Sequence, residues 1–243
     1  MEASAVSGGG DVSIKKIYGI VKIHEDGSAF FRVPANRNVF FQALDENYME
    51  LHRMRTFINL RPGESRSCIG CHEFRRNAPG LKPARPLAMK FPVVTPQPQP
   101  GDTGPRTVHY EADIQPIFNK HCLACHSGEK PKGELDLTGV LTEKFSKSYE
   151  TLTRKKKLVS YLEGGFGSAN VPAEPPLSFG SHRSKLVKRI LKAPCKSKIT
   201  RNEFIKIVTW IDANAPYYGT HEGKKNIKWK DAPNFRPLPV AGK

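Results

Sequence analysis

The chain has 243 residues, enough for one large or two modest domains with hydrophobic cores. Its 39 Lys and Arg residues outnumber 23 Asp and Glu residues, and the formal net charge of +16 favours anionic partners. Because no helix-turn-helix, zinc-finger or RNP-type motif accompanies this charge, it indicates a solvated basic surface rather than nucleic-acid recognition. No apolar run approaches the length of a transmembrane helix.

Residues 1–78 are predicted to form a small antiparallel β unit. Segments 17–23, 28–33 and 39–44 are rich in β-branched and aromatic residues, which is typical of strands. The Asp-Gly pair at 26–27 separates the first two segments and favours a tight turn. The aromatic residues of these segments are expected in a core.

The β unit ends in SCIGCHE, residues 67–73. Here Cys68, Cys71 and His72 form a Cys-x-x-Cys-His motif, which is the attachment signature of haem c. Two thiols about one helical turn apart can each form a thioether with one vinyl group of the porphyrin. The histidine that follows is carried beneath the ring, where its imidazole binds the iron.

Residues 79–105 contain eight prolines, a composition that suits a semi-rigid extended linker. This linker separates the β unit from a mostly helical unit at 106–220, and a basic extended tail is expected at 221–243. The predicted fold class is therefore α+β. A small antiparallel β unit with the first haem site is followed by the Pro-rich linker and by a helical domain of cytochrome c type.

The helical unit opens with a predicted helix that starts at Asp113. Asp113 is expected to be the N-cap, and Pro116 falls in the first turn, where proline is tolerated. The helix leads into a second Cys-x-x-Cys-His motif. Its members are Cys122, Cys125 and His126. The repeated motif predicts two covalent haem c groups, one in each unit.

Three further helices are expected within segments 149–165, 181–193 and 200–216. Gly164-Gly165 is a stop signal for the first, and Thr200 and Glu203 form a capping box at the start of the third. The apolar residues at helical spacing in the unit are predicted to be buried. They are Ile114, Ile117, Phe118, Leu186, Val187, Ile190, Phe204, Ile207, Val208, Trp210 and Ile211.

Other chemistries of the two motifs remain alternatives. A structural zinc ion shared by the two motifs would need an unusual loop, because Cys68 and Cys122 lie 54 residues apart. Two separate zinc sites with three ligands each are the other form of this alternative. A thioredoxin-type dithiol has no use for the histidines, and short-range disulfides do not explain them either. A zinc-stabilised binding module is therefore one functional hypothesis, ranked third behind an electron-transfer module and a haem enzyme.

Three stretches of the sequence resemble one protein family. The region around the first haem of the hydrazine synthase alpha subunit and its planctomycete relatives is similar to DGSAFFRVPANRNVFFQALDENYMELHRMRTFINLRPGESRSCIGCHE. The planctomycete-type cytochrome c domain resembles DIQPIFNKHCLACHSG. The end of the same proteins is similar to TWIDANAPYYGTHEGKKN. The resemblance extends over about residues 15–237.

The resemblance implies that the chain is the C-terminal dihaem part of a longer exported protein, whose upstream β-rich part is missing. Residues 1–16 have neither a basic n-region nor an apolar h-region, so they do not form a signal peptide and an N-terminal truncation is expected. Because haem c is attached outside the cytoplasmic membrane, a periplasmic or otherwise exported location is expected. In the family a tyrosine associated with a catalytically open haem follows the first motif. Glu73 stands there in this chain, which argues against hydrazine synthesis.

The axial ligands of the two irons decide between electron transfer and catalysis. His72 and His126 are predicted as the proximal ligands. His182 is the preferred distal candidate for the second haem, because it stands at a predicted helix start. The other distal candidates are His109 and His121 for the second haem and His24, His52 and Met54 for the first. Cys195 is expected to be a free or buried thiol outside both motifs.

The favoured hypothesis is a dihaem electron-transfer module whose basic surface docks a redox partner with an acidic face. The alternative is a catalytic haem enzyme, hydrazine synthase-like or peroxidase-like, with an open first haem. Its local acid–base candidates are Glu73, His52 and Arg55.

Overall fold

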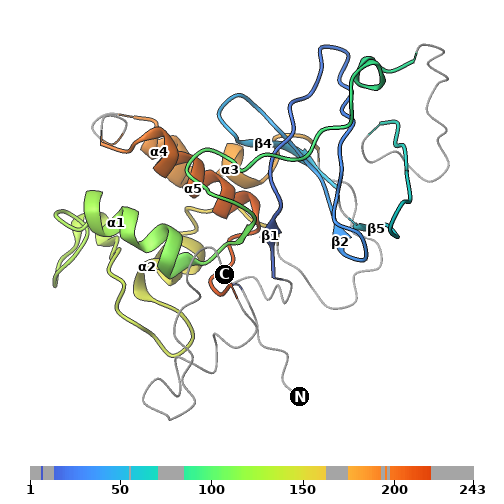
Figure 1. The fold of residues 1–243 in the computed structure, drawn as a ribbon. Helices are drawn as coiled ribbons and strands as arrows, with labels where there is room; N and C mark the ends of the chain where they lie inside the picture. Colours follow the sequence, from blue (N-terminus) through green and yellow to red (C-terminus); the bar gives the residue numbers. More distant parts are fainter. Residues whose placement is uncertain are drawn as a thin grey trace, which may run out of the picture.

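The structure is a computed structural model in which residues 7, 14–54, 56–70, 85–162, 175–192, 195 and 198–219 are described. Its strands are β1 (Lys16–Ile17), β2 (Asn38–Val39), β3 (Gln42–Leu44), β4 (Glu50–Arg53), β5 (Ile58–Asn59) and β6 (Arg106–Thr107). Its helices are η1 (Leu87–Lys90), η2 (Tyr110–Ile114), α1 (Gln115–His121), η3 (Lys132–Glu134), α2 (Lys147–Glu150), η4 (Thr151–Lys155), α3 (Gly180–Arg183), α4 (Lys185–Ile190) and α5 (Arg201–Asp212). Figure 1 shows β2, β4 and β5 on one side of the molecule and α1, α2, α4 and α5 on the other.

The strands form three separate antiparallel pairs, β1 with β6, β2 with β5 and β3 with β4. The strand expected at 17–23 is reduced to β1 and to a bridge between Ile20 and Gln97. Proline has no N–H group to donate, so the prolines on either side of Gln97 prevent this bridge from growing into a ladder. The strand expected at 28–33 is likewise reduced to one bridge, between Phe31 and Val94.

The turn expected at 26–27 is confirmed. Gly27 has a φ of +80°, and the N–H group of His24 donates to the carbonyl of Ser28 over 2.9 Å. The same turn holds η1, because the Asp26 carboxylate accepts the Leu87 N–H at 2.7 Å and the Ser28 hydroxyl accepts the Ala88 N–H at 2.9 Å. The part of the Pro-rich segment from residue 85 onward is thus packed along the first unit.

The aromatic residues of the predicted strands lie mostly near the surface. Phe30 is 42% exposed, whereas Phe31 and Phe41 are half-buried and pack edge to face with their ring centroids 5.3 Å apart. Val39 is buried. The α+β class and the unit boundaries stay predictions, and the tail at 221–243 lies outside the described residues.

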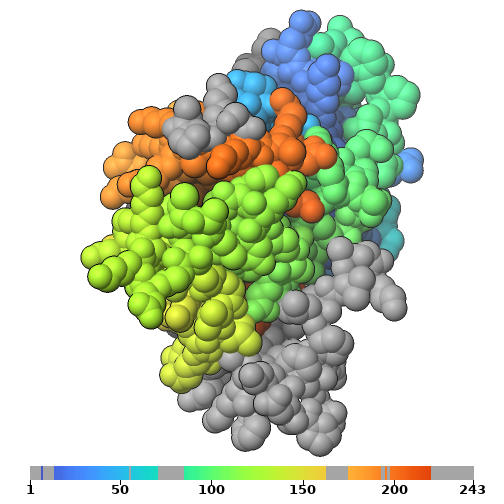
Figure 2. Space-filling view, turned by 90° about the vertical axis from the view of Figure 1, so that its left-hand side faces the viewer, coloured from blue at the N-terminus to red at the C-terminus, as the bar shows by residue number. Residues whose placement is uncertain are grey.

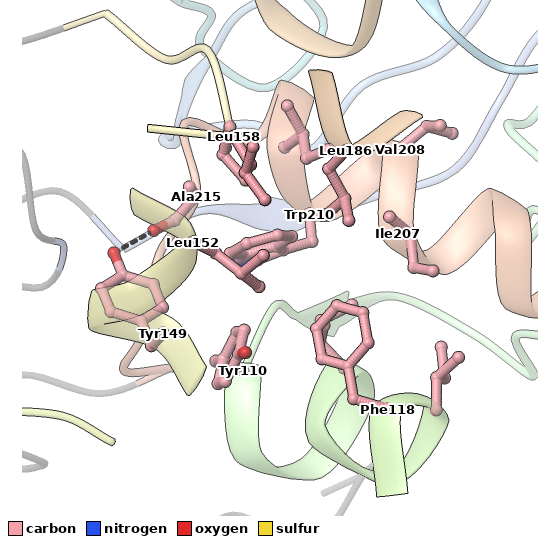
Figure 3. Packing of buried hydrophobic residues seen from close by; sticks show 14 of the residues in the cluster. Tyr110, Phe118, Tyr149, Leu152, Leu158, Leu186, Ile207, Val208, Trp210 and Ala215 are labelled. Carbon is pink, nitrogen blue, oxygen red and sulfur yellow. Dashed lines mark hydrogen bonds between the residues drawn. The ribbon is translucent and has the colours of Figure 1, made fainter. Parts of the chain in front are cut away.

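The main hydrophobic core belongs to the helical part of the chain. Tyr110 lies with its ring centroid 5.1 Å from that of Trp210 and 6.4 Å from that of Phe118. Figure 3 shows these rings together with Tyr149, whose hydroxyl donates to the carbonyl of Ala215 over 2.6 Å. Figure 2 shows the segment that carries α1 packed against the segment that carries α5. Within the described residues no helix combines the length and apolar character needed to cross a bilayer.

Helix α5 agrees closely with the sequence. The capping box of Thr200 and Glu203 is present, and the expected apolar stripe is buried except for Phe204, which is half-buried. The apolar residues expected to be buried in α1 and α4 are also buried. Pro116 lies in the first turn of α1, as predicted.

Three expected helices differ in their limits. The N-cap of α1 is Ile114 rather than Asp113, which lies within the π-helix η2 and accepts the His109 N–H at 2.8 Å. The helix expected from residue 149 begins at α2 and ends with η4, before Gly164-Gly165, which lies outside the described residues. The helix expected from residue 181 is divided into α3 and α4, because Ser184 has an extended backbone with ψ of 124°.

Candidate functional site

The second motif begins where α1 ends. Cys122 is the C-cap of α1, and its carbonyl accepts the N–H groups of Cys125 at 3.1 Å and of His126 at 3.0 Å. These two bonds wind the chain through one further turn after the helix. The two thiols are therefore carried on a single compact turn, as the spacing of the motif predicts.

The imidazole of His126 is held in a defined orientation. Its Nδ1 atom lies 3.1 Å from the carbonyl oxygen of Lys132. A carbonyl can only accept, so Nδ1 carries the proton and Nε2 of the neutral ring keeps a free lone pair. A histidine fixed in this way by a backbone carbonyl has the tautomer that binds a metal through Nε2.

The loop that carries this carbonyl is tied back to the motif. The Lys132 N–H donates to the carbonyl of Cys125 over 2.9 Å, and the Leu137 N–H donates to the carbonyl of His126 over 2.9 Å. The loop therefore follows the motif on both sides of the histidine. The orientation of His126 is set by the backbone rather than by a neighbouring side chain.

The two thiols of the second motif differ in their surroundings. Cys122 is half-buried, and burial, followed by the nearby Cys195 thiol, raises its pKa to about 11. Cys125 is exposed. Cys195 thus lies nearer to the motif than its sequence position led us to expect. The four described cysteines, Cys68, Cys122, Cys125 and Cys195, are all free thiols.

The end of α1 is attached to the start of α5. Nε2 of His121 lies 3.0 Å from Oε2 of Glu203, and the ammonium group of Lys120 lies 3.1 Å from Oε1. Partial burial acts to raise the pKa of Glu203, but hydrogen bonds from Thr200, His121 and Lys120 outweigh it and hold the pKa at about 2. The carboxylate is therefore ionised and fixes the residues that precede Cys122.

The first motif is only partly described. Cys68 is exposed, and it follows a turn in which the Glu64 N–H donates to the carbonyl of Arg61 over 3.0 Å. Cys71, His72 and Glu73 lie outside the described residues, as does Arg55. The arrangement of the first haem site therefore stays a prediction.

The preferred distal candidate for the second haem, His182, faces the turn of the β3–β4 hairpin. Its Nε2 lies 3.2 Å from the Asp45 carboxylate, within ion-pair distance but without the alignment of a hydrogen bond. His121 is engaged by Glu203, as described above. His109 is 4% exposed, and burial lowers its pKa to about 4 despite the nearby Asp113 carboxylate.

The distal candidates of the first haem occupy separate places. The ring of His24 stacks on that of Phe91, with centroids 5.0 Å apart and planes 9° apart. His52 is half-buried in β4, opposite Ala43 of β3. Met54 donates its N–H to the carbonyl of Phe41 over 3.0 Å.

Within the described ranges, no group of three or more His, Cys, Asp and Glu side chains is arranged to hold a metal ion. Sequence reasoning missed the contribution of Lys132, because any residue can supply a backbone carbonyl and its side chain carries no signal. It also missed the partners of Glu203. The capping box was visible in the sequence, but the approach of His121 is a tertiary contact between residues 82 positions apart.

Comparisons with known proteins point to one enzyme. Residues 2–73 match the family model described as "Hydrazine synthase alpha subunit middle domain". The "Hydrazine synthase subunit alpha" of Kuenenia stuttgartiensis is 24% identical over an alignment 284 residues long, gaps included, which takes in 89% of this chain and 34% of that protein. The solved Kuenenia stuttgartiensis hydrazine synthase is 20% identical with a TM-score of 0.48, over 75% of this chain and 30% of that one. The chain thus spans about a third of the curated relative and is similar to the hydrazine synthase alpha subunit, as its motifs indicated.

Proposed function

We propose that the chain is a dihaem c-type cytochrome module that transfers electrons as part of a larger exported redox protein. The observation that carries the proposal is the contact between Nδ1 of His126 and the carbonyl of Lys132. It leaves Nε2 free as a metal ligand directly after a turn that presents two free thiols. A disulfide gives no reason for the orientation of this ring. A zinc ion would use the same Nε2 atom, and the repeat of the whole Cys-x-x-Cys-His motif is what favours haem c over zinc.

Two haem c groups would be held by this chain's own residues. Cys122 and Cys125 would carry the second porphyrin, with His126 as the proximal ligand, and Cys68, Cys71 and His72 would hold the first. When bound, the iron of such a group takes up and releases single electrons. The backbone of the 126–137 loop positions the proximal imidazole, and the ionised Glu203 keeps the end of α1 on the core.

The similarity to a protein named as a subunit of hydrazine synthase supports a chain that works together with other proteins. A β-rich part of the longer protein that the resemblance implies and a separate redox protein are the proposed partners. The net charge of +16 favours an acidic docking face on the redox protein, since opposite charges raise the rate of encounter. A periplasmic or otherwise exported location follows from the chemistry of haem c attachment.

The same similarity favours a second candidate function, catalysis on small nitrogen species at an open first haem. An enzyme of this kind needs one iron with a free axial position and an acid–base group beside it. Glu73 takes the place at which the family has tyrosine, and a carboxylate is a different, negatively charged neighbour for the iron. The electron-transfer reading is therefore placed first.

The test is an optical spectrum of the chain, produced with a periplasmic haem-attachment system, in the oxidised and reduced states with and without carbon monoxide. Two covalent haems by mass and two low-spin spectra unchanged by carbon monoxide are expected. One high-spin haem that binds carbon monoxide would support the hypothesis of a catalytic haem enzyme. A chain without haem would support the hypothesis that the two motifs bind zinc.

A matched pair of variants assigns the second site. His126→Ala should change the spectrum of one haem and leave the spectrum of the other unchanged. Cys195→Ser, which removes a thiol outside both motifs, should leave both spectra unchanged. Equal loss of both haems in His126→Ala would contradict the expectation of two separate sites.

A further inference from the structure

A buried polar cluster joins the β3–β4 hairpin to the helices α3 and α5. Its central residues are Glu50 of β4, which is 2% exposed, and Asp212, the last residue of α5, which is 1% exposed. The Glu50 N–H donates to Oδ2 of Asp212 over 3.0 Å. Two carboxyl groups far apart in the sequence therefore share one buried interface.

Each carboxyl group has several donors. The Arg53 guanidinium lies with Nε 2.5 Å from Oε1 of Glu50, and the side-chain amide of Gln42 donates to Oε2 of Glu50 and, over 2.7 Å, to the Asp212 carbonyl. Asp212 accepts the Ser181 N–H and the Ser181 hydroxyl, each at 2.7 Å. The cluster is thus well supplied with hydrogen bonds to its oxygen atoms.

The charges of the cluster do not balance if both acids are ionised. Arg53, which also stacks its guanidinium 4.8 Å from the centroid of the Phe179 ring, is the cation that contacts Glu50. Two carboxylates and one guanidinium would leave one uncompensated negative charge in a site shielded from water. Burying such a charge is costly, and a protein avoids the cost by keeping one acid protonated.

We propose that Glu50 and Asp212 hold one proton between them, and that loss of this proton loosens the docking of the β3–β4 hairpin on α3 and α5. Burial raises the pKa of Glu50 to about 7, with Arg53 opposing and the Asp212 charge adding to the rise. Burial also raises the pKa of Asp212. The raised pKa values of both acids agree with a cluster in which two carboxyl groups and one guanidinium retain a proton.

The other charged groups of the packed elements lie at the edges of the cluster. Asp45, in the hairpin turn, faces His182 of α3, and the adjacent Glu46 carbonyl accepts from Arg201 at the start of α5 over 3.1 Å. His52 lies in β4 between the cluster residues, and Arg183 of α3 is exposed. The charge of Arg53 favours the ionised form of Glu50, whereas the charge of Asp212 opposes it.

The direction of the pH effect follows from the raised pKa. The docked state binds the proton more tightly than the released state, in which a glutamate has its ordinary pKa of 4.5. Docking is therefore strongest below pH 4.5 and weakens as the pH rises to about 7, by up to about tenfold in the docking equilibrium for each pH unit.

The test is hydrogen exchange of the full chain, as produced with its haem groups, read by mass spectrometry on peptides from the hairpin and from α1. After correction for intrinsic exchange, protection of the hairpin should fall on the order of tenfold between pH 6 and pH 8. Protection of α1 should stay the same over this pH range. Glu50→Gln, which cannot ionise, should remove this fall, whereas Glu143→Gln, a change to an exposed acid, should retain it.

An unchanged hairpin in the wild type, or an equal fall in Glu50→Gln, would overturn the proposal. Should Glu50→Gln fail to fold, infrared difference spectra of the wild type at pH 6 and pH 8 answer the same question. The carbonyl band of a protonated carboxyl group should be present at the lower pH and lost at the higher one, and its absence at pH 6 would reject the shared proton. Neither measurement depends on which function the haem groups serve.

Discussion

His121 and Glu203 join the end of α1 to the first turn of α5, with Nε2 of the histidine 3.0 Å from Oε2 of the carboxylate. The same carboxylate completes the α5 capping box, because its Oε2 accepts the Thr200 N–H at 2.9 Å. One side chain therefore starts a helix and holds the residue before Cys122. The placement of the second motif depends on the start of a helix about 80 residues further along the chain.

Glu203→Gln separates these two contributions. Glutamine can still complete a capping box, so the variant loses the charge that faces Lys120 and His121 and keeps the cap. We expect the free energy of unfolding at pH 7 to fall by about 1 kcal/mol, measured by urea denaturation. Since the pKa of Glu203 is held at about 2, the wild type should lose this advantage as the pH falls from 4.5 towards 2.

Thr200→Ala is the matched change, because it removes the side-chain cap and leaves the ion pairs. Its cost of about 1 kcal/mol should show little dependence on pH. An equal pH dependence in the two variants would mean that Glu203 acts only as a capping residue.

Gly180 lies close against Asp212. It has a φ of +65°, and a Cβ atom built on it would collide with Oδ1 of Asp212. Gly180→Ala should therefore combine the strain of a positive φ with a steric clash in the buried cluster. We expect it to destabilise the protein by about 3 kcal/mol or more in urea denaturation.

Gly27→Ala is the control for Gly180→Ala, because Gly27 also has a positive φ, +80°, and a Cβ atom there would meet nothing within 4 Å. Its cost should be limited to the strain of about 1–2 kcal/mol. If the two substitutions cost the same, the contact with Asp212 is not the source of the effect.

The thiols of the second motif should differ in reactivity. The thiolate is the reactive form, and burial together with Cys195 raises the pKa of Cys122 to about 11. In chain produced without haem attachment, iodoacetamide at pH 8 should modify the exposed Cys125 at least tenfold faster than Cys122, as followed by peptide mass spectrometry. Both should react alike in urea, which serves as the control, and equal rates in the folded chain would contradict the described burial.

His182 offers a direct choice between two expectations. The sequence predicts a distal haem ligand, whereas the contact with Asp45 gives this histidine a partner in the hairpin turn, where Asp45 also accepts the Met49 N–H at 2.9 Å. From the contact we expect His182→Gln to leave both haem spectra unchanged and to reduce stability by up to about 1 kcal/mol. A high-spin shift of one haem in this variant would instead identify His182 as an iron ligand.

The sequence predicted best where the decisive contacts are local. The capping box at Thr200, the turn at Gly27 and the position of Pro116 each depend on residues within one or two turns of chain, and all three are confirmed. The first two predicted strands were wrong in length, because Ile20 and Phe31 find their partners in a Pro-rich segment that cannot support a continuous ladder.

The buried cluster could not be predicted from pattern alone, since Glu50 and Asp212 lie 162 residues apart. One signal was present. Asp212 follows Val208 by four positions and Ile205 by seven, so it continues the apolar stripe of α5 rather than its polar face. A charged residue on such a stripe indicates a buried partner, although it does not say which residue that partner is.

The pairing of β1 with β6 has a consequence for how the chain could be rebuilt. Lys16 lies opposite Thr107 and Ile17 opposite Arg106, so the chain departs from and returns to one place on the helical part. The two paired strands resemble the stem of a hairpin, and the chain between them forms its very large loop. A short turn joining the two strands would therefore excise the first motif with its surroundings and yield a chain with the second motif alone. The face of α3 and α5 that meets the β3–β4 hairpin would then need new, neutral side chains in place of its buried acid.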